Sequence, residues 1–490
     1  MARNSITIRL ATFVPPGQRV YNLANRQCSI TGHIHLMSTA LSVARSLRTL
    51  LADHSYRRVL ALALPAVGEQ LLNMAVGLFD TFMVGHIGAE AVAAVGLANQ
   101  AVMLVTTFYA AVATGVTALV ARHVGAGEPD QANRILHQGY LLGTGIGLLG
   151  AISVLALALP IMAALRAPAE VMGPGAGYLR ITAATYLLAA WLFVGSAGLR
   201  GAGDTRSPML VMLVVNIINI VVAYLFIYGP GPFPALGVAG SAIGAATARG
   251  VGGLLVTWLL WRGRGGLRLQ PWRFLPDLSQ IKRILNIGVP AGAEQLMMRL
   301  GMTAYITTVA ALGTKAYAAH QLALQGESLA YMPGFGFAVA ATTLVGQGLG
   351  ARDPARARSD GYLAQRLAVI LMAGMGVLFF TFPAQIIGVF IDDPEVIQLG
   401  IWPLRLVAFS QPALATMMVL AGGLRGAGDT RATLVITAAG LWLVRLPLAL
   451  LLTGPLGLLG AWIAMGVDLN LRGLGMWLRF RSGRWAEIMV

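Results

Sequence analysis

The chain contains 490 residues, of which 57% are hydrophobic and only 11% are charged, and its mean hydropathy is +0.72. This composition excludes a set of ordinary soluble domains, because their surfaces would need far more charged side chains. The formal net charge is +16, but the arginines lie mainly in short segments between apolar runs. That distribution is typical of the cytoplasmic side of a membrane protein and argues against a nucleic-acid partner. The single cysteine, Cys28, cannot form an intrachain disulfide.

Residues 1–55 differ in kind from the rest of the chain. They carry scattered arginines in mixed sequence and lack the long apolar segment of a secretory signal. We expect these residues to form a disordered cytoplasmic tail. The alternative is that the start codon is assigned too early and that Met37 is the true first residue.

Apolar segments long enough to cross a hydrocarbon core of about 30 Å as helices recur along the remaining chain. They predict an all-α polytopic protein of the inner (plasma) membrane with twelve transmembrane helices. If the amino terminus is cytoplasmic, the external loops hold only Arg166, Arg180 and Lys315 as basic residues, so both termini are expected in the cytoplasm. The predicted helices cover 59–82, 93–121, 136–161, 175–197, 208–228, 237–261, 287–311, 317–346, 364–388, 399–421, 433–453 and 457–478.

The chain repeats itself at a constant offset of 225 residues. Pro65-x-x-x-Glu69-Gln70 returns as Pro290-x-x-x-Glu294-Gln295 (290 − 65 = 225). Gly198-Leu-Arg-Gly-Ala-Gly-Asp-Thr-Arg206 returns letter for letter as Gly423-Leu-Arg-Gly-Ala-Gly-Asp-Thr-Arg431. Identity over nine residues in register with other matches indicates a duplicated six-helix unit.

The duplication predicts two six-helix lobes, residues 56–261 and 286–480, joined by a basic cytoplasmic linker, 262–285, and followed by a cytoplasmic tail, 481–490. Because six is even, both copies enter the membrane from the same side, so their pseudo-two-fold axis runs along the membrane normal. Parallel repeats of this kind are a feature of transporters, with the substrate site between the repeats. A membrane enzyme has no need of this symmetry, and no nucleophile, metal cluster or cofactor motif is evident, so no cofactor is expected.

Ionisable side chains at membrane depth are costly and mark candidate sites. Glu69 and Asp80 are eleven residues apart, a rotation of about 1100° that leaves them about 20° apart on one helix face, with Asn73 between them. This stripe suits a relay for protons or sodium ions. The amides of Asn216, Asn219 and Asn99 could hydrogen-bond to Asp80 if their helices line the same cavity, or they could join helices instead. The alternatives are that Asp80 caps the helix end and that Glu69, like its repeat partner, forms a packing or gating hydrogen bond.

The second lobe lacks an equivalent stripe. Its residues at the positions of Asn73, Gly77 and Asp80 are polarizable or aromatic, and form a wall suited to flat organic cations, or else ordinary core. The candidate substrate cavity contains Asn73, Asn99, Glu294, Met298, Met302, Tyr305 and Glu327. We also expect Pro333 to break its helix, Glu327 to be able to pair with Arg299, and Asp468 to pair with Arg472.

These motifs resemble the multidrug and toxic compound extrusion family, and within it the branch similar to DNA-damage-inducible protein F. The resemblance is carried by Leu64-Pro65, Gly77-Leu-Phe-Asp80-Thr-Phe-Met-Val-Gly85, Ala318-Ala-His-Gln321 and the two Leu-Arg-Gly-Ala-Gly-Asp-Thr-Arg loops. It implies a monomeric twelve-helix exporter that exchanges organic cations and other toxic compounds for inward-moving protons or sodium ions, with membrane lipid as its surroundings.

The resemblance places the coupling aspartate of the family on Asp80 and its asparagine on Asn219. A second aspartate of related proteins is Ala223 here. Some relatives also carry an acidic residue on the tenth helix, but the corresponding region of this chain, Gln411-Pro-Ala-Leu-Ala-Thr416, contains none. Only one carboxylate of the family's pattern is then present, which favours protons as the coupling ion, because a dehydrated sodium ion prefers several oxygen ligands. Sodium remains the alternative. The competing function is a flippase for lipid-linked precursors or a polysaccharide exporter, which four intramembrane arginines keep open. These are Arg249, Arg299, Arg405 and Arg445.

Overall fold

The computed structural model describes residues 54–270 and 275–488, and these residues form helices and connecting loops without a strand. The expectations for the amino-terminal tail lie almost entirely outside the described residues. Residues 59–490 form one compact unit, to which the following description applies.

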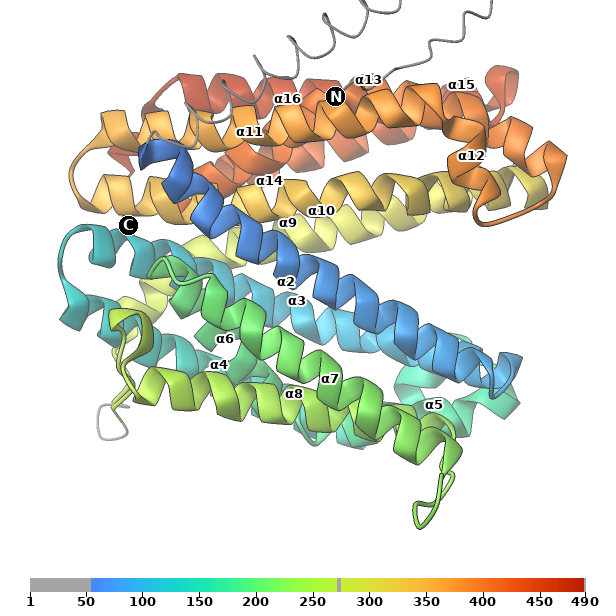
Figure 1. The fold of residues 1–490 in the computed structure, drawn as a ribbon, viewed down its shortest axis with the longest axis horizontal. Coiled ribbons are helices and arrows are strands. Elements are labelled where there is room, and N and C mark those ends of the chain that lie inside the picture. The colour runs from blue at the N-terminus through green and yellow to red at the C-terminus, as the bar shows by residue number, and fades with distance from the viewer. Residues whose placement is uncertain (1–53, 271–274, 489–490) are drawn as a thin grey trace, which may run out of the picture. The chain divides into compact units, whose positions relative to one another are not determined.

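The first lobe contains seven helices in chain order (Figure 1). They are α2 (His54–Gly85), α3 (Ala89–Gly125), α4 (Pro129–Ala164), α5 (Ala169–Ala183), α6 (Tyr186–Gly201), α7 (Arg206–Tyr228) and α8 (Val238–Trp261). Helices α5 and α6 meet at a bend of 56° and together make one broken span.

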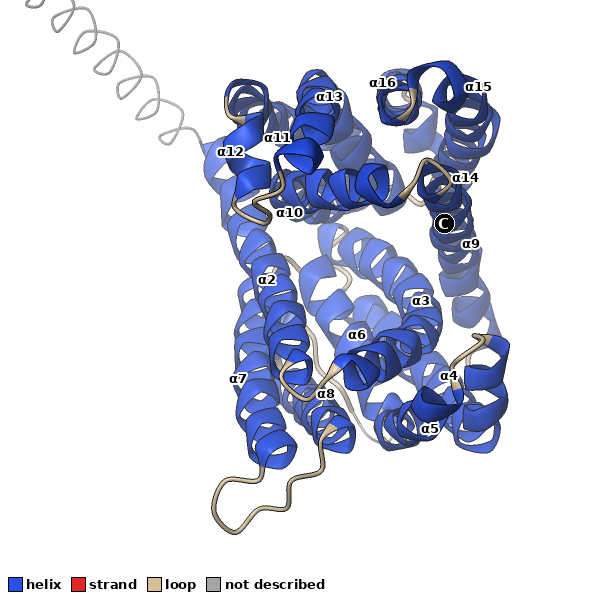
Figure 2. Ribbon diagram, turned by 90° about the vertical axis from the view of Figure 1, so that its right-hand side faces the viewer, coloured by secondary structure: helices blue, strands red, loops and turns tan. Residues whose placement is uncertain are grey.

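The second lobe repeats this order after the short turn η1 (Arg264–Gly266). Its elements are α9 (Leu278–Ala310), α10 (Thr314–Gly350), α11 (Pro354–Thr381), α12 (Pro383–Gly388), α13 (Pro394–Gly426), α14 (Thr430–Ala439), the π-helical turn η3 (Gly440–Arg445), α15 (Leu446–Leu456), α16 (Leu458–Arg481) and the turn η4 (Arg484–Glu487). The segment Thr430–Leu456 forms one span. Viewed from the side in Figure 2, α3 to α8 gather on one side and α10 to α13 on the other.

The helices match the twelve predicted spans. Within the described ranges nine segments are long and apolar enough to cross a membrane, and the bent pair α5–α6 is a tenth. Helices α9 and α16, of 33 and 24 residues, supply the other two and are less apolar because they carry charged side chains. Large apolar side chains such as Leu149 and Leu451 are about two-thirds exposed, as expected where helices face lipid.

The expected break at Pro333 is wrong. Helix α10 continues through this residue from Thr314 to Gly350, and α2 likewise continues through Pro65. Proline is tolerated inside membrane helices because neighbouring helices and local adjustments satisfy the freed backbone carbonyl. In α10 the next residue, Gly334, lies directly against the sulfur atoms of Met418 and Met372, so packing around the proline is dense.

Close contacts at glycines join the two lobes. A Cβ atom at Gly288 of α9 would lie 2.6 Å from the backbone oxygen of Ala111 in α3. The contact related by the repeat (63 + 225 = 288; 111 + 225 = 336) puts Gly336 of α10 against Ala63 of α2, where a Cβ would lie 2.8 Å from the backbone oxygen. Since a side chain does not fit, these helices approach closely, and the repeat symmetry extends across the interface.

A second reciprocal contact lies where α3 and α10 end, and we call it the linker-end seam. Gly125 packs on the backbone of Gln347, and Gly350 packs on the backbone of Arg122 (122 + 225 = 347; 125 + 225 = 350). The Gln347 side chain also donates a hydrogen bond of 3.1 Å to the backbone oxygen of Gly201 in the other lobe. The seam therefore holds the lobes together at this end of the helices.

The connection between the lobes is shorter than predicted. Helix α9 begins at Leu278, inside the predicted linker 262–285, because the polar residues that follow form an amphipathic first turn rather than a loop. Asp277 caps this helix. Hydrogen bonds from the Ser279 hydroxyl and then from the backbone amide of Gln280 lower the pKa of the Asp277 carboxyl.

The carboxyl-terminal segment after α16 is packed against the lobes. Trp485 is 1% exposed and stacks on Phe480 with ring centroids 4.7 Å apart. The backbone oxygen of Ile488 accepts a hydrogen bond of 3.0 Å from Arg122 in the first lobe. The segment predicted to be a tail is therefore folded as far as residue 488, and it contacts the first lobe through Ile488.

Candidate transport site

Asp80 lies on α2 beside α7, and two hydrogen bonds define its level. Asn216 of α7 donates to the backbone oxygen of Leu72 at 2.8 Å, and Tyr228 of α7 donates to that of Met83 at 2.9 Å. Helices α2 and α7 therefore run in the same direction, and Asp80 lies near the level of Ala223. The apolar sequence after Asp80 continues the helix to Gly85, so Asp80 is within the helix rather than its cap.

Buried polar oxygens without a partner are concentrated in this lobe. Within the described residues, one carboxylate oxygen of Asp80, Oδ1, is buried and accepts no hydrogen bond. The other unpartnered oxygens of the lobe are Asn216 Oδ1, Asn219 Oδ1, Ser241 Oγ, Tyr109 Oη and Tyr186 Oη. A buried unsatisfied polar atom costs about 1–3 kcal/mol, so a group of them indicates where a proton, an ion or water is held.

The amides do not bond to Asp80 as we expected from the sequence. The Asn216 amide is used by the backbone of α2, and Asn99 Oδ1 lies 3.3 Å from the Tyr178 hydroxyl, which donates to it. The side chains of Asn216 and Asn219 are buried, and Asn73 is exposed. The sequence analysis did not identify Ser241, Tyr109, Tyr178 or Tyr186. The sequence shows them only as single hydroxyl groups within apolar helices.

Arg249 of α8 is the cation of this lobe that acts on Asp80. Its charge interacts electrostatically with Asp80 and with Tyr178, although no described residue forms an ion pair with it. Helix α8 packs tightly on α7, since a Cβ at Gly244 would lie 2.7 Å from the Cβ of Ala223. Arg249 lies five residues beyond Gly244, about 7.5 Å along the helix axis, so it is near the level of Asn219.

Glu69 and Glu294 form equivalent ion pairs. Glu69 accepts a hydrogen bond from Arg200 at 2.8 Å, and Glu294 accepts one from Arg425 at 2.7 Å (69 + 225 = 294; 200 + 225 = 425). Glu294 is 3% exposed and also accepts hydrogen bonds from two threonine hydroxyls of α14. Glu69 is therefore paired with Arg200 rather than free to act with Asp80, and Glu294 is absent from the lining of the cavity described below, in agreement with the packing or gating alternative.

The second lobe contains a partly open cavity of about 190 Å³. It contains three of the residues predicted for it, Met298, Met302 and Glu327. Tyr305 is not in the lining, because it is 1% exposed and its hydroxyl donates to the backbone oxygen of Ala461 at 2.8 Å. The full lining is Met298, Met302, Leu324, Glu327, Ser328, Tyr331, Leu414, Met417, Arg445, Met465, Leu469 and Arg472.

Two arginines of the lining, Arg445 and Arg472, belong to a buried triad of charges, whose third member, Asp468, lies behind them. The predicted pair of Asp468 and Arg472 is confirmed, with Nη2 and Oδ2 2.6 Å apart and a second bond of 2.8 Å. Arg445, which sequence reasoning missed as a partner, adds a bond of 2.8 Å to the same carboxylate. It is brought there by the π-helical turn η3, a local distortion that often marks functional sites. The side chains of all three residues are at most 5% exposed.

Glu327 lines the cavity without a partner. Its side chain is 9% exposed and makes no ion pair or hydrogen bond with any described residue. The hypothetical pair with Arg299 is not formed, since Arg299 is exposed on α9, and the charge that acts on Glu327 is Arg445. His320, seven residues earlier on α10, is fully buried between Tyr305 and Trp462, and neither of its ring nitrogens has a hydrogen-bond partner.

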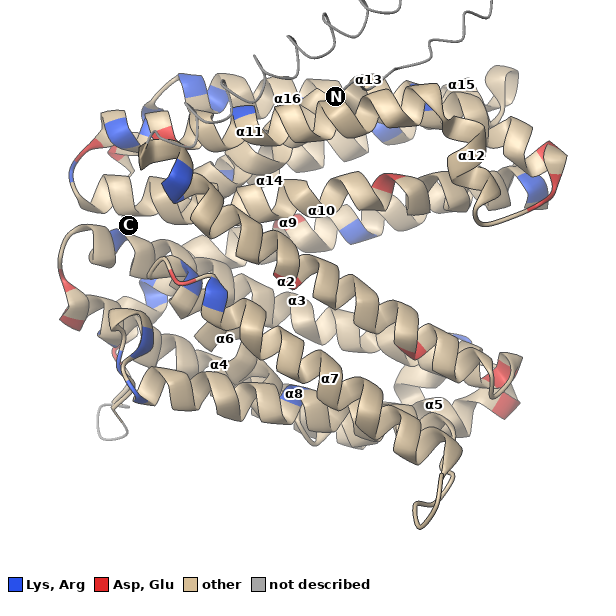
Figure 3. Cartoon of the chain, in the orientation of Figure 1, with Lys and Arg blue, Asp and Glu red and all other residues tan. Residues whose placement is uncertain are grey.

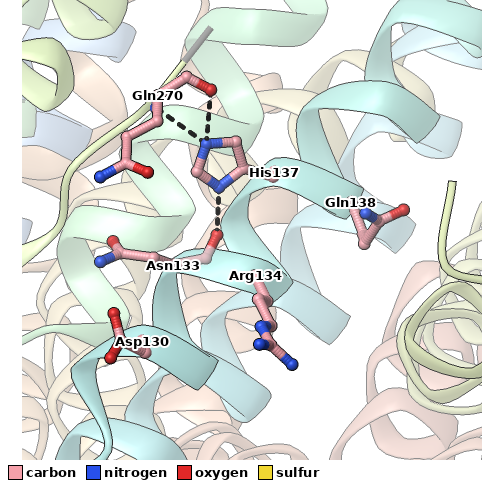
Figure 4. A pocket seen from close by; sticks show the side chains of 6 residues that line it. All are labelled: Asp130, Asn133, Arg134, His137, Gln138 and Gln270. Carbon is pink, nitrogen blue, oxygen red and sulfur yellow. Dashed lines mark hydrogen bonds between the residues drawn. The ribbon is translucent and has the colours of Figure 1, made fainter. Parts of the chain in front are cut away.

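A small polar pocket lies where the connection between the lobes docks on α4 (Figure 4). Its volume is about 40 Å³. His137 Nε2 lies 2.8 Å from the backbone nitrogen of Gln270, and Gln138 donates to the backbone oxygen of Leu275 at 2.9 Å. Since these polar groups hold the connecting segment, the pocket is a structural contact rather than a ligand site.

The MatE family model matches residues 65–225 and 290–451, once in each lobe. The two matches begin 225 residues apart (290 − 65 = 225), which is the offset of the sequence repeat. The duplication read from the sequence is therefore the duplication of this family.

Relatives cover nearly the whole chain. It is 33% identical over 442 residues to the probable multidrug resistance protein NorM of Thermotoga maritima, covering 89% of this chain and 94% of that protein. It is 30% identical over 437 residues to the multidrug resistance protein MdtK of Yersinia pseudotuberculosis, covering 87% and 95%. The fold resembles that of the MATE transporter VcmN of Vibrio cholerae in its bent form, with a TM-score of 0.81 at 23% identity, covering 87% and 96%. The chain belongs to the MatE family of multidrug and toxic compound extrusion transporters and is a multi-pass membrane protein.

Proposed function

We propose that this protein exports organic cations and other toxic compounds in exchange for inward-moving protons, by alternating access of its two lobes. The observation that carries the proposal is the separation of two sites, the unpartnered Asp80 carboxylate in the first lobe and the methionine-rich cavity in the second. The names of the relatives, which are multidrug resistance proteins, support export of drugs.

The charge distribution supports a cytoplasmic linker. In Figure 3, Lys and Arg gather at the end of the helices that carries the linker and the carboxyl terminus. The positive-inside rule assigns this end to the cytoplasm. Because the linker-end seam joins the lobes there, we infer that the described conformation is closed toward the cytoplasm.

The two lobes divide the work in this proposal. Asp80, which has a buried oxygen without a partner, exchanges the coupling proton. Methionine sulfur and the Tyr331 ring give the cavity of the second lobe an adaptable, polarizable wall for flat cations. Exchange requires that proton and substrate oppose each other's binding, so that each leaves when the other arrives.

Transport into or out of vesicles tests the proposal directly. Purified protein is reconstituted, and ethidium movement is followed by fluorescence while a pH gradient and a sodium gradient are imposed separately. We expect the pH gradient to drive ethidium transport. Transport driven by sodium alone would replace the proton as the coupling ion, and the absence of transport under both gradients would overturn the proposal.

A flippase for lipid-linked precursors is the second candidate, and one observation favours it. Arg445 and Arg472 line the cavity of the second lobe, and an arginine fork binds phosphate well. However, the Asp468 carboxylate already occupies both guanidinium groups. Translocation of a fluorescent anionic lipid in the same vesicles, together with no ethidium movement, would establish this second candidate instead.

A further inference from the structure

The cavity of the second lobe contains a carboxylate, Glu327, to which the proposed function assigns no proton exchange. Glu327 is more than nine-tenths buried, lines the cavity, and has no partner within the described residues. Its repeat counterpart is Val102 (327 − 225 = 102), while the counterpart of Asp80 is Tyr305. Among the described residues inside the membrane-spanning helices, each lobe therefore has one carboxylate without a partner, and the repeat does not relate the two positions.

The groups that face Glu327 come from each helix around the cavity. The turn η3 contributes Arg445, α16 contributes Asp468 and Arg472, and α10 itself contributes Tyr331. Tyr305 of α9 and His320 of α10 are fully buried behind the wall, with their ring centroids 5.7 Å apart, and the Arg445 guanidinium lies over the Tyr305 ring. Helix α13 contributes only apolar groups, Leu414 and Met417.

The charges of this cavity can be counted. Two arginines and the Asp468 carboxylate leave one excess positive charge, which an ionised Glu327 balances. A proton on Glu327 raises the total to one positive charge, and so does an organic monocation beside the ionised carboxylate. Proton and cation together would leave two excess positive charges in an apolar interior, where like charges repel strongly. The two ligands are therefore alternatives.

We propose that Glu327 is a second exchange site, at which an entering organic cation displaces a proton. The protonated carboxyl group loses its proton to the water of the side to which the cavity opens, and the carboxylate then pairs with the cation. The total charge of the cavity is unchanged by this step. The inference rests on the proposed export function and extends it. With one proton exchanged at Asp80 and one at Glu327, two protons enter for each monovalent cation that is exported.

Proton release on binding tests the site without transport. Ethidium, whose charge is permanent, is titrated into the purified full-length protein by calorimetry in buffers of different ionisation enthalpy, which reports protons released per cation bound. We expect the Glu327→Gln variant to release fewer protons than the wild type, and Glu327→Asp to restore the release. The matched control is Glu395→Gln, which removes an exposed glutamate paired with Lys315 outside the cavity and should release as the wild type does.

The transport stoichiometry gives a second readout. In vesicles with the membrane potential held at zero, the substrate ratio at zero net flux rises about 100-fold per pH unit for two protons and about tenfold for one. We expect the first value for the wild type. Glu327→Gln has the charge of the protonated residue, so it should bind ethidium more weakly, and the flux that remains should follow the second value. A wild-type value of one proton, or release that Glu327→Gln leaves unchanged, overturns the inference. Proton release that depends on Glu327 in a protein without transport would uphold this site and reject export.

Discussion

Glu69 and Arg200 form an ion pair of 2.8 Å that joins the first helix of one lobe to the end of α6. Their counterparts Glu294 and Arg425 do the same in the second lobe at 2.7 Å. Each arginine belongs to a Leu-Arg-Gly-Ala-Gly-Asp-Thr-Arg loop, so the duplicated loop anchors one helix per lobe at the linker end. The carboxylates thereby hold the helix frame in which the unpaired Asp80 can act.

The two pairs should differ in what they contribute to stability. We expect Glu294→Gln to lower the thermal unfolding temperature in detergent more than Glu69→Gln. Glu294 is the more buried and accepts two further hydrogen bonds, and breaking a buried pair costs about 3–5 kcal/mol. Equal losses in the two variants, measured by intrinsic fluorescence, would contradict this difference.

Replacing Asp80 should abolish coupling and leave the fold intact. Asp80→Asn keeps the shape of the side chain but cannot exchange a proton, so we expect ethidium transport driven by a pH gradient to fall at least about tenfold, a loss of coupling of about 1.4 kcal/mol or more. Protein yield and unfolding temperature should stay near those of the wild type. Glu90→Gln, at the exposed start of α3, is the control that should transport normally. Undiminished transport by the asparagine variant would remove Asp80 from the mechanism.

The linker-end seam should not tolerate a methyl group. In Gly350→Ala the new Cβ would overlap the backbone oxygen of Arg122, so the ends of α3 and α10 must separate. Spin labels are attached at Asp130 and Ala355, two exposed positions related by the repeat, in a protein that carries Cys28→Ser. We expect the distance between the two labels to be longer with Gly350→Ala than without it.

The control for this experiment is Gly374→Ala, because nothing lies within 4 Å of a Cβ at that helical glycine. It should leave the distance between the labels unchanged. A distance in Gly350→Ala that equals the control would show that the seam is not closely packed in solution.

The carboxyl-terminal segment should contribute to stability through Trp485. Trp485→Ala removes a buried ring that stacks on Phe480 and donates to its backbone oxygen at 2.7 Å. Truncating a buried aromatic side chain costs about 3–5 kcal/mol, so we expect a clear decrease in unfolding temperature. Trp485→Phe retains the ring contact and loses only the hydrogen bond, so its decrease should be smaller. If both variants unfold as the wild type does, the segment is not packed as described.

The sequence by itself determined the fold class, the duplication and the position of Asp80. Apolar length is a local property, and it predicts membrane helices because every backbone polar group must be satisfied inside the helix. The offset of 225 residues needs only a comparison of the chain with itself. A carboxylate inside an apolar run is conspicuous in the sequence alone, because an ionisable group at membrane depth is costly and therefore rare.

Only the tertiary structure decided which polar groups have partners. Glu69 and Arg200 are 131 residues apart, and Arg445 and Asp468 lie on different helices, so no periodicity relates them. The same holds for Asn99 and Asn216, whose hydrogen bonds go to Tyr178 and to the backbone of α2 instead of to Asp80. Pairing in a membrane interior depends on helix packing and on the direction of each side chain, and these are set by contacts between distant segments. For the same reason, only the packed helices show that Glu327 has no partner among the described residues.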